Sequence, residues 1–145
     1  MTKKLWIYGV SAAVACSFVA ATAAEKEKKH VTIDASKLPP ASDKQGVTYA
    51  ADIKPIFEKS CIKCHGPEKQ KAKLRLDSLE AALKGGQDGK VVEAGKSAES
   101  VLIANVAHLG DEDEWMPPPD NKDKIPMLTK EQIGLIRAWI DQGAK

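Results

Sequence analysis

The segment Cys61-Ile62-Lys63-Cys64-His65 constrains this chain more than any other part of its sequence. The two thiols stand three residues apart, and a histidine follows the second thiol directly. In this Cys-x-x-Cys-His pattern each thiol can add to one vinyl group at the edge of a haem, and the histidine is brought beneath the iron. The spacing therefore predicts one covalently attached haem c, bound through Cys61 and Cys64, with His65 as the proximal axial ligand.

Three other interpretations of this segment are weaker. A thioredoxin-like redox pair would need a preceding strand and a βαβ context, and neither is visible in the sequence. A structural zinc site would need a fourth ligand, for which His108 is the only reasonable candidate. A disulfide between Cys61 and Cys64 would be strained and would leave His65 without a role.

The second axial ligand has to come from elsewhere in the chain. Met116 is followed by three prolines, which hold the backbone extended and stiff, so a thioether can be presented to iron at little ordering cost. Met127 also lies in a proline-containing loop, but its place just before the last predicted helix favours packing in the core. His108 is a further alternative and would give a haem of lower potential than methionine ligation. We expect Met116 to be the ligand.

The N-terminal residues have the pattern of an export signal. Lys3 and Lys4 precede an apolar stretch over residues 5–21, and small residues end at Ala24, before a charged run. Residues 1–24 are therefore predicted to be a signal peptide that is cleaved near Ala24, which places the mature chain in the periplasm. A membrane attachment remains open in two cases: the signal stays uncleaved, or Cys16, which follows an imperfect lipobox, carries a lipid.

The rest of the chain divides into two parts. Residues 25–46 are charged, contain prolines and show no sustained apolar period, so they are predicted to form a flexible tail. Residues 47–145 form a single predicted domain of short helices and long loops, because no segment alternates long enough to demand a sheet. The expected helices lie at about 48–59, at 79–83, around 102–106, and from the capping box at Thr129 to Gly143.

The charge balance excludes some classes of function. A formal net charge of +2 and a pI of about 8.4 give no reason to expect nucleic-acid binding. Several basic residues nevertheless surround the attachment segment, and they either form a solvated face or steer an acidic protein partner. These residues are Lys59, Lys63, Lys69, Lys71, Lys73 and Arg75.

Taken together, these motifs resemble the planctomycete-type cytochrome c domain, a member of the class I c-type cytochromes. The resemblance runs from about Ala51 to Ala144, and its matching segments are Ile53–Phe57, Cys61–Pro67, Leu74–Asp77, Gly85–Gly86, Gly95–Ser97, Met116–Pro118 and Trp139–Ile140. It implies an all-α fold wrapped around one haem c, His65 and Met116 as axial ligands, and electron transfer outside the cytoplasm. One departure is the acidic run at 111–114, beside the expected ligand loop.

The expected function is a single-electron carrier between two redox proteins, whose identities the sequence does not reveal. With both axial positions of the iron filled, no substrate would reach it, and the chain would not be an enzyme. Two alternatives stay open. One is a haem peroxidase-like enzyme, in which Met116 is displaced and His108 serves on the distal side. The other is a haem-based sensor or a subunit of a dehydrogenase complex.

Overall fold

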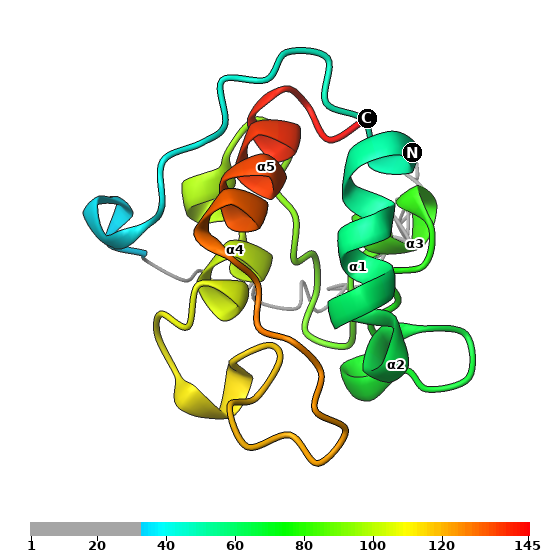
Figure 1. Ribbon diagram of the computed structural model, residues 1–145. Coiled ribbons are helices and arrows are strands. Elements are labelled where there is room, and N and C mark those ends of the chain that lie inside the picture. Colours follow the sequence, from blue (N-terminus) through cyan, green and yellow to red (C-terminus); the bar gives the residue numbers. More distant parts are fainter. Residues whose placement is uncertain (1–32) are drawn as a thin grey trace, which may run out of the picture.

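The computed structural model describes residues 33–145, so the predicted export signal at 1–24, with Cys16, and the first part of the predicted tail lie outside the described residues. Within 33–145 the chain is helical and has no β-sheet, as expected from the sequence (Figure 1). No helix in this range is long and apolar enough to span a bilayer. The elements are, in chain order, η1 (Ala35–Lys37), η2 (Tyr49–Ile53), α1 (Lys54–Ser60), α2 (Ile62–His65), η3 (Lys71–Lys73), α3 (Leu79–Lys84), η4 (Ser97–Glu99), α4 (Val101–Val106), η5 (Glu112–Glu114) and α5 (Lys130–Asp141).

Local sequence signals account for where several helices begin. The predicted helix at 48–59 is a turn of π-helix, η2, followed by α1, and Pro55 lies in the first turn of α1, where its missing N–H costs no hydrogen bond. The side chain of Ser78 caps α3 by accepting from Ala81 N–H, 3.3 Å. At α5 the predicted capping box is present, because Thr129 and Gln132 accept reciprocally from each other's backbone N–H.

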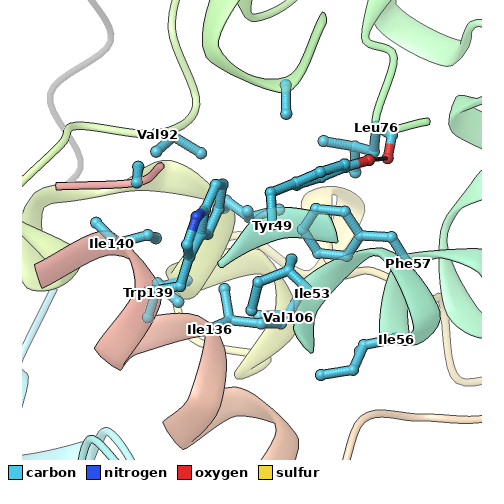
Figure 2. Close-up of a cluster of buried hydrophobic side chains, with 14 of the residues drawn as sticks. Tyr49, Ile53, Ile56, Phe57, Leu76, Val92, Val106, Ile136, Trp139 and Ile140 are labelled. Atoms are coloured by element: carbon cyan, nitrogen blue, oxygen red, sulfur yellow. Dashed lines mark hydrogen bonds between the residues drawn. The ribbon is translucent and has the colours of Figure 1, made fainter. Parts of the chain in front are cut away.

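The core is built around three aromatic side chains from η2, α1 and α5 (Figure 2). Tyr49, Phe57 and Trp139 meet pairwise, with ring centroids 6.0 to 6.4 Å apart. Phe57 and Trp139 are fully buried and pack edge to face, as core residues do. Tyr49 is also buried, and its hydroxyl donates to the Leu76 carbonyl, 2.8 Å. This cluster fixes η2 and α1 against α5.

The predicted flexible tail includes a stretch that packs against α5. Leu38 is buried, and Ser42 N–H donates to the Gly134 carbonyl at 2.9 Å. A Cβ on Gly134 would lie 2.6 Å from the Pro40 carbonyl oxygen, so the chain can cross here only because residue 134 has no side chain. The guanidinium of Arg137 donates to the Pro39 carbonyl. These contacts depend on residues about a hundred positions away, which the local composition of residues 25–46 does not reveal.

Candidate cofactor site

A cavity of about 250 Å³ lies between segments that are far apart in the sequence. All four residues that the sequence predicts to hold the cofactor line it: Cys61, Cys64, His65 and Met116. The first three belong to the turn formed by α2, whereas Met116 follows η5, and Figure 1 shows these two elements on different sides of the lower part of the molecule. The structure therefore brings the predicted attachment segment and the predicted sixth ligand to one cavity.

The attachment segment is a single helical turn that starts where α1 ends. Cys61 N–H donates to the Phe57 carbonyl at 2.8 Å, and the Cys61 carbonyl accepts from both Cys64 N–H, 3.0 Å, and His65 N–H, 2.9 Å. In a helical turn, residues three and four positions apart share one face. Cys64 and His65 lie three and four positions after Cys61, and all three residues line the same cavity.

Burial controls the protonation state of this segment. It raises the pKa of the Cys61 thiol to about 12, and the neighbouring Cys64 adds to this effect. For His65, burial lowers the pKa of the imidazole below its usual value, although the backbone carbonyls of Leu74 and Lys71 act in the opposite direction. The imidazole is therefore favoured in its neutral form, which is the form that binds a metal ion.

The backbone of Met116 is anchored to α4. Its N–H donates to the Asn105 carbonyl at 3.0 Å, and Asn105 itself lines the cavity. Further along the loop, the Asn121 side chain holds a tight turn by donating to the Pro118 and Ile125 carbonyls and accepting from Ile125 N–H. Asn121 belongs to no motif in the sequence, and only its place in a proline-rich stretch indicates a turn residue.

The two alternative sixth-ligand candidates, His108 and Met127, lie outside the cavity. His108 does not line the cavity, and its Nε2 is 3.0 Å from the Pro117 carbonyl oxygen. Met127 does not line it either, and this side chain is 44% exposed, so the expectation that Met127 packs in the core is wrong. The hydrophobic position before α5 is taken by Leu128, which packs against the core. Of the three sixth-ligand candidates, Met116 alone lines the cavity.

Two buried nitrogens at this site lack protein partners. Within residues 33–145, the buried side-chain nitrogen and oxygen atoms without a hydrogen bond are His65 Nδ1 and Trp115 Nε1, and both residues line the cavity. Native proteins pair nearly all such atoms, so a group bound in this cavity would account for both. A haem would do so, because its iron takes an imidazole ligand and its carboxylates accept hydrogen bonds. The residues present thus fit this cofactor.

A zinc site does not fit the described residues as well. Among them no group of three or more His, Cys, Asp or Glu side chains is arranged to hold a metal ion. His108, the only fourth ligand that the zinc interpretation had, is turned toward Pro117 instead. A haem needs only axial ligands from the protein, since the porphyrin supplies the other four.

The charges around the cavity are mixed. Lys71 and Lys90 line it together with four acidic residues, which are Asp88, Asp113, Glu114 and Asp123. Lys63, between the two cysteines, pairs with Asp123, 2.8 Å, and Arg75 pairs with Asp77, 2.6 Å. The acidic run at 111–114 folds as η5, where Asp111 accepts from Asp113 N–H, 3.1 Å. Acidic residues therefore lie among the basic residues near the attachment segment.

Comparison with known proteins agrees with this geometry. Residues 61–120 match the family model described as Planctomycete cytochrome C. The matched range begins at Cys61 and includes Met116, so it spans both cofactor-facing elements. No curated protein and no solved structure matches the chain. The match over residues 61–120 thus supports a planctomycete-type cytochrome c domain in this chain, and the all-helical fold of residues 33–145 agrees with that class.

Proposed function

We propose that this chain is an exported single-electron carrier whose one haem c is linked through Cys61 and Cys64, with His65 and Met116 as axial ligands. The observation that carries the proposal is the shared cavity, to which the attachment turn and Met116 come from opposite ends of the matched range. When bound, the haem iron supplies one-electron chemistry by alternating between its ferrous and ferric forms.

The residues of the chain would do three things in this role. The thiols of Cys61 and Cys64 hold the cofactor covalently, so its retention does not depend on non-covalent affinity. The neutral imidazole of His65 and the thioether of Met116 would hold the iron, and a methionine ligand would raise the potential relative to a second histidine. Apolar side chains supply part of the cavity wall, as the buried Leu74 and the partly buried Val91 illustrate.

A carrier is favoured over a peroxidase-like enzyme by the position of His108. An enzyme would need an open or displaceable axial position and a nearby acid–base group. His108 was the one candidate for that group, yet it does not line the cavity, and its Nε2 is engaged with the Pro117 carbonyl. The sensor and dehydrogenase-subunit alternatives receive no specific support from the described residues.

Export and partners complete the proposal. The pattern of residues 1–24 supports transfer to the periplasm, with a membrane tether only if the signal is retained or Cys16 is lipidated. The mass and N-terminal sequence of the mature protein would distinguish these three forms. The partners would be a donor and an acceptor redox protein. Because acidic and basic residues both line the cavity, the docking surface of a partner would carry both signs of charge and not acidic groups alone.

The test is an optical spectrum of the haem-loaded protein, oxidised and reduced. We expect a low-spin spectrum with the weak far-red ferric band that marks methionine ligation. Met116→Ala should abolish this band, whereas Met127→Ala, a matched change at an exposed methionine, should keep it. A low-spin spectrum without the band would overturn Met116 as the ligand, and a high-spin spectrum would favour an enzyme or a sensor.

A further inference from the structure

His108 occupies a backbone position that disfavours its side chain. It is the residue after the C-cap of α4, with φ of 53°, in the left-handed region. Leu109 N–H donates to the Ala104 carbonyl, 2.9 Å, and His108 N–H to the Asn105 carbonyl, 3.3 Å. This is the Schellman arrangement, in which glycine is the usual residue because a Cβ is strained there. A histidine at this position makes side-chain contacts that a glycine could not make.

The side chain of His108 contacts both neighbours of Met116. Its ring stacks on the indole of Trp115, with centroids 4.8 Å apart and planes 8° from parallel. Its Nε2 lies 3.0 Å from the Pro117 carbonyl oxygen. Because a carbonyl only accepts, Nε2 carries the proton and donates it. One imidazole thus holds the residues on either side of the proposed ligand.

The backbone adds a third attachment at the same place. The Asn105 carbonyl accepts from Met116 N–H, 3.0 Å, and also from His108 N–H, 3.3 Å. Met116 is therefore held through its own N–H, while its two neighbours are held by His108. Since His108 itself does not line the cavity, any influence of this residue on the cofactor passes through these contacts.

We propose that His108 is a positioning residue that fixes the Trp115–Pro117 segment and so holds the Met116 thioether in place for the iron. The inference rests on the proposed function, because it takes Met116 as the sixth ligand. Holding the loop in advance removes the ordering cost of ligation, so an external ligand has more difficulty in displacing the thioether. Without the imidazole, the loop is freer and displacement becomes easier.

The experiment measures how tightly free imidazole binds the ferric, haem-loaded protein, because this ligand must displace Met116. The informative variant is His108→Gly, which removes the side-chain contacts while suiting the left-handed backbone. The matched control is Lys73→Gly, because Lys73 also has a left-handed backbone, φ 56°, but is exposed and does not line the cavity. Global stability is measured for each variant by denaturant unfolding.

The His108→Gly variant is expected to bind imidazole about 10-fold more tightly than the wild type. This factor corresponds to the free energy of one hydrogen bond, here the bond from His108 to the Pro117 carbonyl that the variant lacks. Its far-red ferric band should weaken, while its global stability should not fall. Lys73→Gly should match the wild type in imidazole affinity. In a Met116→Ala background, His108→Gly should have no further effect, because there is no thioether left to position.

Two results would overturn the inference, and they are distinguishable. If Met116→Ala tightens imidazole binding but His108→Gly does not, the positioning role of His108 is wrong and the axial role of Met116 stands. If Met116→Ala leaves both the far-red band and the imidazole affinity unchanged, Met116 is not the ligand, and the proposed ligation fails together with the role of His108.

Discussion

Lys63 and Asp123 form an ion pair of 2.8 Å that joins the attachment turn to the loop after Met116. Lys63 stands between the two cysteines, and Asp123 lies sixty positions further along the chain. The pair thus links the two elements that face the cavity by a contact that no local sequence pattern reveals. Both side chains are substantially exposed, so the strength of the pair depends on salt.

The first prediction concerns the stability that the Lys63–Asp123 pair contributes at different pH values. The hydrogen bond from Lys63 lowers the pKa of Asp123 below its usual 3.8. A carboxyl group with a lowered pKa stabilises the fold at any pH above its ordinary value, and this contribution is lost as the pH falls through the lowered pKa. Asp123→Asn should therefore be slightly less stable than the wild type at neutral pH. The difference should vanish in strong acid or high salt, as measured by denaturant unfolding.

Asp120→Asn is the control for this prediction. Asp120 is exposed in the same loop and has no ion pair among the described residues, so the variant makes the same change of charge without breaking a contact. Equal losses of stability in the two variants would contradict a specific Lys63–Asp123 interaction.

The second prediction concerns Tyr49. Tyr49→Phe removes the hydroxyl that donates to the Leu76 carbonyl, 2.8 Å, and leaves that carbonyl buried without this donor. We expect a loss of about 1–2 kcal/mol in the free energy of unfolding. Burial raises the pKa of Tyr49 from 10.0 to about 12, so the protonated hydroxyl contributes stability below pH 10.0 that is lost as the pH rises toward 12. The gap between wild type and variant should therefore narrow over this range. Equal stability at neutral pH would show that the hydrogen bond contributes nothing.

The third prediction concerns Gly134. In an ordinary helix interior, replacing glycine by alanine stabilises by about 1 kcal/mol. Here the new Cβ would lie 2.6 Å from the Pro40 carbonyl oxygen, so the 38–42 segment would have to move off α5. We expect Gly134→Ala to destabilise instead, by about 1–3 kcal/mol. Thermal unfolding measures the sign directly, with Lys130→Ala at the exposed start of α5 as a neutral comparison. A gain in stability would mean that this segment does not pack as described.

The fourth prediction concerns the two thiols. Cys61→Ala and Cys64→Ala should each keep covalent haem through the remaining thiol, and the double variant should lose it, as haem staining on a denaturing gel reports. Cys61 is buried in the core, whereas Cys64 is only partly buried. Loss of the Cys61 side chain should therefore lower the stability of the protein more than loss of Cys64. Covalent haem in the double variant would refute attachment through these thiols.

Local signals in the sequence predicted the parts of this fold that depend on neighbouring residues. The capping box of α5 and the all-helical class follow from the residues nearby. The gathering of Cys61, Cys64 and His65 at one cavity follows from their spacing in a helical turn.

The remaining features depend on contacts between distant positions. Residues 25–46 are predicted to be flexible because they are charged, contain prolines and show no sustained apolar period, yet Gly134 and Arg137 on α5 contact the 38–42 segment within them. Met127 was expected in the core, although Leu128 packs there instead. Likewise, only the fold reveals that His108 faces Trp115 and Pro117 rather than the cavity, because these contacts require the chain to reverse after α4.

The aromatic core and the cavity use different residues. Tyr49, Phe57 and Trp139 do not line the cavity, and residues 107–129 supply none of the largest fully buried side chains. Sequence change at the cavity-lining positions of that loop therefore leaves the three core aromatics untouched. Related domains can in this way vary the lining of the cavity around a constant aromatic core.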